Sequence, residues 1–290
     1  SNARVVIGTA LYTSDFSPSS TTLTNVTNTK FLACQTSNPS EATVVINGNA
    51  SDTATTIGNP ASSTEDPFEG NYSVQFGGSP DYLAIADSTD FDLASSDFTM
   101  ECWYFPLSHP SWVGLISQWP NGNYNVSNSW TLEPVGGNLY FYFCKTNGTF
   151  SNVAAPGSLQ TNQWQHCAIS KKNNQLKCFL NGSGSSWVDI NGTLQNTTSD
   201  LTIGGYVAPS SGSGWANGRI SNVRITKGEC VYENNFTPST SPLTTTSQGA
   251  TESNVKLLCC QKSIITMAAI TPNPITIGGG DPTPSTSDPY

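Results

Sequence analysis

The chain has 290 residues and a formal net charge of −9, with 11% charged and 10% aromatic residues. Its 11 basic residues are scattered and no stretch approaches the roughly 18 apolar residues of a membrane span, which argues against nucleic-acid binding and membrane insertion. The aromatic content excludes a disordered polar chain, and the abundant Ser, Thr, Asn and Gly predict a β-rich fold with long polar loops.

The first segment of the chain returns near its end. Residues 4–18, RVVIGTALYTSDFSP, resemble residues 224–238, RITKGECVYENNFTP. Five positions are identical, namely Arg4 and Arg224, Gly8 and Gly228, Tyr12 and Tyr232, Phe16 and Phe236, and Pro18 and Pro238. The likeness continues with KFLACQ at 30–35 and KLLCCQ at 256–261. Such self-similarity predicts tandem units of about 220 residues, of which one complete period is visible.

Short strand patterns fill the middle of the chain, separated by Gly, Pro, Asn and Ser clusters typical of turns. They are YSVQF (72–76), YLAIA (82–86), FTMECWYF (98–105), VGLISQW (113–119), LYFYFC (139–144), WQHCAIS (164–170), LKCFLNG (176–182), LTIGGY (201–206) and RISNVRIT (219–226). Residues 164–182 read as a hairpin with a polar tip. No segment shows sustained helical periodicity, so we predict an all-β, antiparallel two-sheet jelly-roll sandwich with flanking strand-bearing extensions. We expect its core to contain Phe76, Trp103, Trp164, Ile169, Phe179, Ile203 and Val223.

Three blocks of sequence, 71–106, 164–182 and 201–228, together resemble the laminin-G/concanavalin A-like jelly roll, in the form common in tailed-phage virion proteins and bacterial adhesins. The resemblance implies two antiparallel sheets packed face to face, with rim loops. It divides the chain into four parts. They are an extension resembling the end of a preceding repeat unit (1–29), a jelly roll (30–228), a linker (229–254) and an extension resembling the start of a further unit (255–290).

Catalytic motifs are weak, and we expect no enzyme activity. The eight Glu residues never form the E-x-D-x-x-E strand pattern of the glucanases that share this fold, and Glu101 is expected to point to solvent. Of the two histidines, His109 is in a loop and His166 is expected to be structural, and no G-x-S-x-G motif is present. The eight cysteines lack zinc-type spacing and are expected to be reduced.

Carbohydrate binding is the remaining chemistry, because aromatic rings offer flat apolar platforms to sugars. The candidate residues in loops are Trp112, Trp119, Tyr124, Trp187 and Trp215. These rings could instead cover sheet edges or pack at a subunit contact. The resemblance also implies a structural Ca²⁺ at the rim, for which Asp81 and Asp87 are candidate ligands, with Asp90 and Asp92 nearby in the sequence. The alternative is that these aspartates serve turns and solubility, and we expect no other cofactor.

Two functions stay open. The first is a non-enzymatic structural or adhesion protein of a phage-like virion or surface appendage, whose laminin-G-like module binds host-surface glycans. The second is a purely structural fibre, decoration or filament subunit without a small ligand, which assembles by strand pairing within the chain or with neighbouring subunits. Its assembly segments would contain Arg4, Val5, Val6, Tyr12, Phe16, Leu257 and Leu258. Partners would be other copies of the chain, other virion or appendage proteins or host glycans, and the location a virion or an extracellular surface.

Overall fold

The computed structural model describes residues 3–17, 23, 26–33, 42–44, 72–78, 80–109, 112–120, 128–206, 214–262, 264–280, 282–287 and 289. The chain divides into two compact units, residues 1–70 and 71–290. Within these described residues, no helix is long and apolar enough to cross a membrane.

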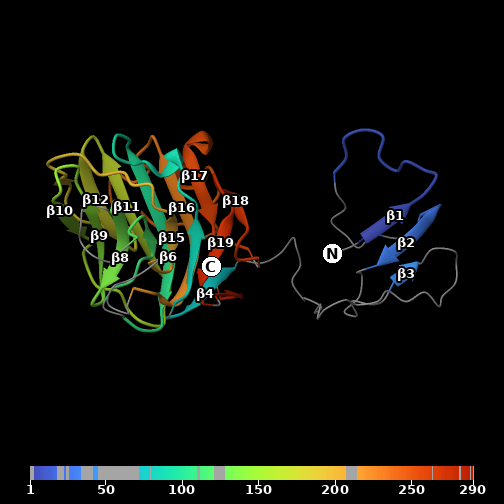
Figure 1. The fold of residues 1–290 in the computed structure, drawn as a ribbon, viewed down its shortest axis with the longest axis horizontal. Helices are drawn as coiled ribbons and strands as arrows, with labels where there is room; N and C mark the ends of the chain where they lie inside the picture. The colour runs from blue at the N-terminus through green and yellow to red at the C-terminus, as the bar shows by residue number, and fades with distance from the viewer. Residues whose placement is uncertain are drawn as a thin grey trace. The chain divides into compact units, whose positions relative to one another are not determined.

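The N-terminal unit contains a three-stranded antiparallel sheet in its described part (Figure 1). Its strands β1 (Ala3–Val6), β2 (Thr29–Ala33) and β3 (Ala42–Val44) are ordered β1-β2-β3. Asn28, just before β2, has a positive φ of 67°, and its carbonyl accepts a hydrogen bond of 3.1 Å from Ile7 N. This turn brings β2 back alongside β1, and leaves β1 as an edge strand of the described sheet.

The second unit is a sandwich of two antiparallel sheets, which confirms the predicted fold class (Figure 1). In the described residues, one sheet has seven strands, ordered β10 (Phe150–Ala154), β9 (Asn138–Cys144), β8 (Trp130–Val135), β7 (Ile116–Ser117), β15 (Leu201–Ile203), β5 (Tyr82–Ile85) and β19 (Ile275–Gly279). The other has ten, with a main path of β13 (Ser183–Gly184), β12 (Gln175–Leu180), β11 (Gln165–Lys172), β6 (Phe98–Pro106), β16 (Asn217–Lys227), β17 (Val255–Cys259) and β18 (Ala268–Ile270). Off this path, β14 (Val188–Asp189) pairs with β12, β4 (Ser73–Gly77) with β16, and β20 (Thr283–Ser285) with β4.

Helix is confined, in the same described residues, to three short 3₁₀ turns. They are η2 (Thr89–Phe91), η3 (Ser247–Gly249) and η4 (Glu252–Asn254). The predicted hairpin at 164–182 is also present, as β11 and β12. Its tip residues Asn173 and Asn174 both have positive φ, 55° and 114°, which asparagine tolerates better than most residues.

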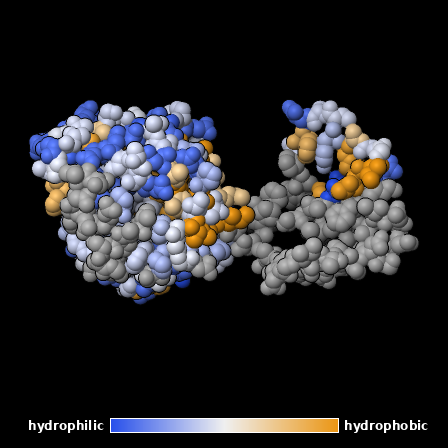
Figure 2. All heavy atoms as spheres, in the orientation of Figure 1, coloured by the Kyte–Doolittle hydropathy of each residue, from blue (hydrophilic) through white to orange (hydrophobic). Residues whose placement is uncertain are grey.

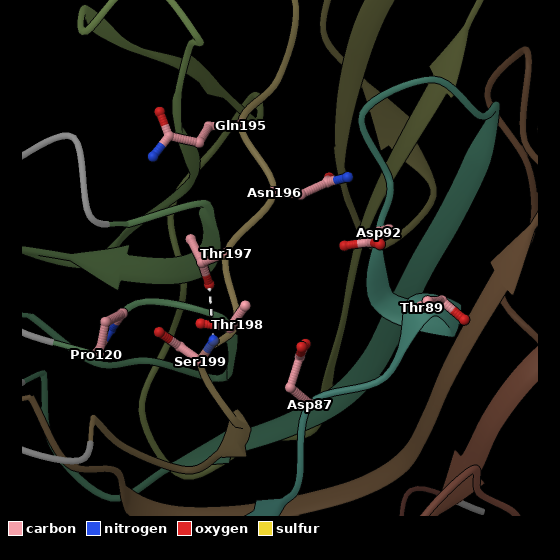
Figure 3. Close-up of a pocket in the computed structure, with 9 residues that line it drawn as sticks. All are labelled: Asp87, Thr89, Asp92, Pro120, Gln195, Asn196, Thr197, Thr198 and Ser199. Carbon is pink, nitrogen blue, oxygen red and sulfur yellow. Dashed lines mark hydrogen bonds between the residues drawn. The ribbon is translucent and has the colours of Figure 1, made fainter.

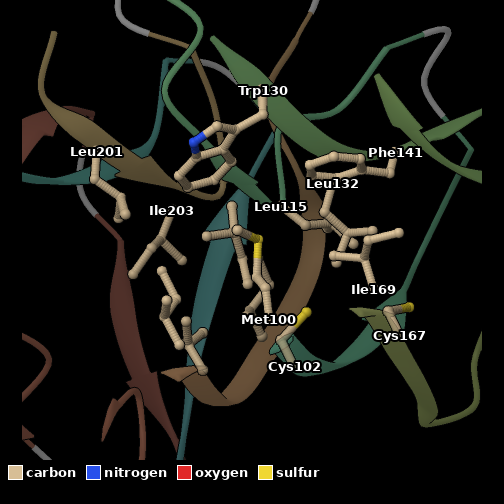
Figure 4. Packing of buried hydrophobic residues seen from close by; sticks show 14 of the residues in the cluster. Met100, Cys102, Leu115, Trp130, Leu132, Phe141, Cys167, Ile169, Leu201 and Ile203 are labelled. Carbon is tan, nitrogen blue, oxygen red and sulfur yellow. The ribbon is translucent and has the colours of Figure 1, made fainter. Parts of the chain in front are cut away.

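The core lies between the two sheets and follows from strand alternation (Figure 4). Alternate side chains of β6 point inward and are fully buried, namely Phe98, Met100, Cys102 and Tyr104. From the facing sheet Trp130, Phe141 and Leu201 meet them. Of the predicted core residues, Phe76, Ile169, Ile203 and Val223 are fully buried between the sheets. Phe179 is also fully buried, but in a separate cluster with Ala168 and Tyr232.

Trp103 and Trp164 correct that prediction, because both are only half-buried on the outer face of the ten-stranded sheet. Trp103 is at an odd position of β6, in step with Glu101 rather than with Met100, so alternation turns it away from the core. Its ring lies edge-on to His166 at 5.2 Å, and Trp164 lies edge-on to Phe105 at 5.5 Å. The presence of these rings in strand motifs therefore did not decide which face of the sheet they occupy.

The C-terminal residues are built into the sandwich. Strand β16 gives the first half of one edge to β4 and the second half to β17, so β4 and β17 lie end to end along it (Figure 1). Farther along, β19 pairs with β5 and β20 pairs with β4. The segment expected to start a further unit thus pairs within its own chain. Its descent from a repeat, and the repeat-unit boundaries, stay predictions.

Candidate functional site

A depression of about 820 Å³ opens at the rim of the sandwich (Figure 3). Two segments face each other across it, 87–92 and 195–199. The lining residues are Asp87, Thr89, Asp92, Pro120, Gln195, Asn196, Thr197, Thr198 and Ser199. This rim pocket is in the size range of small-ligand sites, about 300–1,000 Å³.

The first wall is the short turn that follows β5. Phe91 in η2 is fully buried and anchors the turn in the core. Ser88 caps it, because its side-chain oxygen accepts a hydrogen bond of 3.2 Å from Asp90 N. With its apolar residue held inside, the turn presents Asp87 and Asp92 toward the pocket.

The second wall is the segment that leads into β15. Its backbone is fixed at one end by a hydrogen bond of 2.9 Å from Gln195 N to Cys144 O. In the middle, Asn196 Oδ1 accepts a hydrogen bond of 3.2 Å from Ala94 N. Within the segment Thr197 Oγ1 accepts from Ser199 N at 3.1 Å (Figure 3). The wall is therefore held by the sandwich on several sides.

Gln118 joins the two walls and was missed from sequence. Its fully buried amide donates hydrogen bonds of 3.2 Å to Asp87 Oδ1 and 3.1 Å to Ser199 O. The available signal was a polar residue inside the apolar run VGLISQW. A buried amide bonded to both walls fixes their separation, which pre-organises the pocket.

The lining suits binding of hydroxyl-rich ligands. Eight of the nine lining residues bear a side-chain hydroxyl, amide or carboxylate, and none of the nine is His, Cys or Lys. Such groups donate and accept hydrogen bonds, but the lining supplies no histidine–nucleophile pair.

Two of the predicted aromatic residues lie in one cluster on the outer face of the seven-stranded sheet. Trp119 is there with Tyr206 and Cys144, and the half-buried Trp112 and Tyr142 pack against them. The rings of Trp112 and Tyr142 are 6.3 Å apart. Trp119 is only 3% exposed, so its ring is not an open platform, but it directly precedes Pro120 of the rim pocket.

The other predicted aromatics are not part of this cluster. Trp187 lies between β13 and β14, with Lys177 Nζ 5.7 Å from its ring centroid. Trp215 packs beside Gly205, where an added Cβ would lie 2.4 Å from the indole Cδ1. Tyr124 lies outside the described residues. Tyr142 was missed, although the alternation of LYFYFC places its side chain on the other face of the sheet from Phe141 and Phe143.

The two predicted calcium ligands cannot share an ion. Asp81 directly precedes β5 and Asp87 follows it, so the strand separates them by on the order of 13 Å or more. Asp81 is buried and accepts a hydrogen bond from Gly77 N, as an aspartate serving a turn does. No group of three or more His, Cys, Asp or Glu residues suited to a metal ion occurs in the part of the chain that the structure describes.

Glu101 is the main correction to the sequence analysis, because it is fully buried rather than solvent-facing. Arg224 Nε donates to Glu101 Oε1 at 2.8 Å, while His166 Nε2 and Tyr232 Oη donate to Oε2 at 2.9 and 2.7 Å. Burial acts to raise the pKa of Glu101, but the hydrogen bond from His166 and the charge of Arg224 hold it below its usual value. The buried His166 is thus engaged in a structural contact.

The exit segment, residues 229–250, covers this ion cluster. Arg224 Nη1 donates to Thr244 O at 3.0 Å and to Ser247 O at 2.8 Å. Tyr232 and Phe236 stack on each other at 3.6 Å, and Phe236 lies edge-on to Phe179. The residues expected to form a linker therefore pack on the outer face of the ten-stranded sheet.

The predicted assembly residues divide between the two units. Leu257 and Leu258 are buried in β17, paired with Ile225 and Arg224 of the same chain. Of the alternatives left open for this segment, the structure shows pairing within the chain. The N-terminal residues contrast with them. Val5, Tyr12 and Phe16 are 50%, 51% and 54% exposed, and Arg4 and Val6 are half-buried.

Comparisons with known proteins agree with this architecture. The profile of the concanavalin A-like lectin/glucanases superfamily matches residues 76–230. A candidate carbohydrate-binding protein from Bacteroides ovatus ATCC 8483 is similar in structure, with a TM-score of 0.56 and 17% identity, over 77% of this chain and 61% of that chain. This chain thus spans about three fifths of that protein, and at this identity the likeness shows the fold alone.

Two further solved structures align more loosely. Domains LG4-5 of the mouse laminin alpha1 chain give a TM-score of 0.41 and 15% identity, over 68% of this chain and 47% of theirs. The heptameric SAP-like pentraxin from Limulus polyphemus gives 0.40 and 13%, over 53% of this chain and 75% of its own. No curated protein sequence matches the chain.

Proposed function

Because the chain belongs to the concanavalin A-like lectin/glucanases superfamily, we propose that its jelly roll is a non-enzymatic carbohydrate-binding module that uses the rim pocket. The carrying observation is the lining, in which eight of nine residues bear hydroxyl, amide or carboxylate groups. Sugar hydroxyls both donate and accept hydrogen bonds, so they need this mixture. Gln118 supports the proposal, because it holds the two walls at a fixed separation before any ligand arrives.

The neighbouring aromatic cluster would extend the site. Trp112 and Tyr142 are half-buried and pack beside the fully packed Trp119. A sugar ring that leaves the polar pocket past Pro120 would find an apolar surface there. Asp92 would bind hydroxyls from the opposite wall, and the ligands would be glycans of a host or bacterial surface, met by a protein on a phage-like virion or an extracellular appendage.

A divalent cation would have a role in the same pocket. The side chains that line the pocket offer carboxylate, hydroxyl and amide oxygen atoms, which are the ligand type that Ca²⁺ takes. Asp87 and Asp92 would be the charged ligands of the ion. Asp87 already accepts a hydrogen bond from Gln118, so the cation would share this carboxylate with the amide. When bound, the ion would add a Lewis-acidic contact for sugar hydroxyls.

The test is a glycan array, followed by calorimetric titration of the glycans that bind, with and without EDTA. Asp92→Asn removes a charge from the pocket while keeping its shape, and is expected to weaken binding at least about tenfold. Asp200→Asn is the matched control, since this exposed residue precedes β15 outside the lining. Equal affinity of the two variants, or no binding on the array, would contradict the proposal.

Aromatic variants place the site independently. Trp112→Ala is expected to weaken the same titration, whereas Trp187→Ala, on the other sheet, is expected to leave it unchanged. The reverse pattern would move the site to the β13–β14 side of the sandwich.

A purely structural role is the second candidate function. It is favoured by the exposed apolar side chains of the N-terminal unit, which need a partner in the assembled protein. Glycan binding does not depend on it, because the rim pocket belongs to the other unit.

A further inference from the structure

The N-terminal sheet repeats the end of the jelly roll residue by residue. Strands β1, β2 and β3 correspond to β16, β17 and β18. The matching pairs are Arg4–Leu32 with Arg224–Leu258, Val5–Phe31 with Ile225–Leu257, and Leu32–Val44 with Leu258–Ile270. Both registers shift at the same place, between Val5 and Val6 and between Ile225 and Thr226. The likeness found in sequence is therefore also a likeness of strand register.

The side chains that follow the strand repeat as well. Tyr12 and Phe16 stack at 3.7 Å with planes 7° apart, as Tyr232 and Phe236 do at 3.6 Å and 4°. Arg4 Nη2 donates to Tyr12 Oη at 3.5 Å, so the arginine and tyrosine are also adjacent. The segment thus holds the conformation that its counterpart adopts in the complete jelly roll.

In the complete jelly roll this conformation encloses a carboxylate. Arg224 and Tyr232 both donate to Glu101, which comes from β6, the neighbour of β16 opposite β17. Tyr232 is 4% exposed there, and Phe236 packs on Phe179 of β12.

The corresponding place in the described part of the N-terminal unit is a cavity. This cavity of about 260 Å³ is lined by Arg4, Val6, Thr9, Leu11, Tyr12 and Leu23. In the described sheet β1 has β2 on one side, and its other edge is the one that β16 gives to β6. Exposed apolar side chains gather on this unit (Figure 2). A basic and a phenolic group thus line this cavity, beside an edge of β1 that pairs with no strand among the described residues.

We propose that the N-terminal unit is the closing piece of a second jelly-roll body, joined to the chain ahead of Ala3. That body has the same fold as residues 72–222. Its glutamate, at the position equivalent to Glu101, enters the cavity between Arg4 and Tyr12. The direction of the chain indicates where this body comes from. In the complete jelly roll, the first half of β16 pairs with β4 and β6, which precede it in the chain, so the body that β1 completes would also precede β1. A second copy of this chain does not fit, since its own β16 already fills the place. The inference deepens the structural role above and is independent of glycan binding.

The test adds a copy of residues 72–222 directly before Ala3 of the full chain. Amide hydrogen exchange of residues 4–16 is expected to slow at least about tenfold relative to the unextended chain. Arg4→Ala, or Glu101→Gln in the added copy alone, is expected to reverse much of this protection while leaving the original jelly roll intact. Unchanged exchange in the extended chain would overturn the proposal.

A second variant covers misfolding of the added copy. In the unextended chain, residues 223–238 are replaced by residues 3–18, which keeps the arginine, tyrosine and phenylalanine of both segments. We expect this hybrid to fold with one cooperative transition. An unfolded hybrid would refute the claim that residues 3–18 can close a jelly roll. Protection of residues 4–16 that grows with concentration of the unextended chain would make a second copy the partner and overturn the proposed source.

Discussion

Replacing Glu101 tests the buried ion cluster most directly. Glu101 and Arg224 are 0% exposed, and the guanidinium Nη2 is 2.6 Å from Glu101 Oε1. Glu101→Gln keeps the shape of the side chain but leaves the charge of Arg224 without its counter-ion. Breaking a buried pair in this way costs about 3–5 kcal/mol. For a domain of this size that corresponds to roughly 6–20 °C in Tm.

The assay is urea unfolding at pH 7 followed by tryptophan fluorescence, with thermal unfolding as a second measure. Glu252→Gln is the matched control, because this exposed residue undergoes the same change of charge. It is expected to stay within about 0.5 kcal/mol of the wild type. If Glu101→Gln cost no more than the control, the cluster would not stabilise the fold.

A double variant separates charge from packing. Glu101→Leu and Arg224→Leu each leave one buried charge without its counter-ion, whereas the double change removes both charges. The double variant is therefore expected to be more stable than either single one. Strictly additive losses would refute the coupling between the two side chains.

The same cluster sets a pH dependence. The pKa of Glu101 is held below its usual value in the folded protein, so its contribution is complete above the unfolded pKa, about 4.3, and is lost as the pH falls through the folded pKa. The stability difference between wild type and Glu101→Gln is expected to narrow below about pH 4. A constant difference down to the acid limit of the fold would contradict this cause.

Two further predictions concern the exit segment and the cysteines. Gly182 has φ +77°, and an added Cβ would overlap sterically with Phe236 O. Gly182→Ala is therefore expected to displace the exit segment and speed amide exchange of residues 230–238; unchanged exchange would refute the contact. Burial raises the pKa of Cys144 and Cys230 to about 11, so both are expected to react with iodoacetamide at pH 8 at least about tenfold more slowly than a free cysteine peptide, by mass spectrometry. Equal rates would show that these thiols are open to water.

The sandwich could be predicted from local sequence, because each strand is marked by its own short run of apolar residues between turn residues. The run FTMECWYF located strand β6, and the polar tip at Asn173 located the hairpin, but Trp103 was assigned to the core in place of the inward set from Phe98 to Tyr104. The repeated ends were also visible, since Arg4 and Tyr12 recur with the same spacing as Arg224 and Tyr232. These features depend on neighbours within a few residues, or on direct comparison of two segments.

The contacts that sequence missed depend on distant segments. The partners of Glu101 are 65 and 123 residues away at His166 and Arg224, and nothing local marks a lone glutamate in a strand as paired. Gln118 is similar, because its two acceptors lie 31 and 81 residues away. Of the predicted aromatic residues that the structure describes, only Trp112 and Trp119 lie in one cluster. Strand alternation predicts the face of the sheet on which a ring lies, but it does not predict which loops lie next to each other.

The way the C-terminal strands close the sandwich has a consequence for synthesis on the ribosome. Strands β4 and β5 are among the first of the jelly roll to emerge, yet their partners β20 and β19 come about two hundred residues later. Closing loops of this length is slow, and long-range pairing must wait for both strands. A nascent chain stopped before residue 275 would therefore expose the edges of β4 and β5, which makes this interval the period in which a chaperone would matter most.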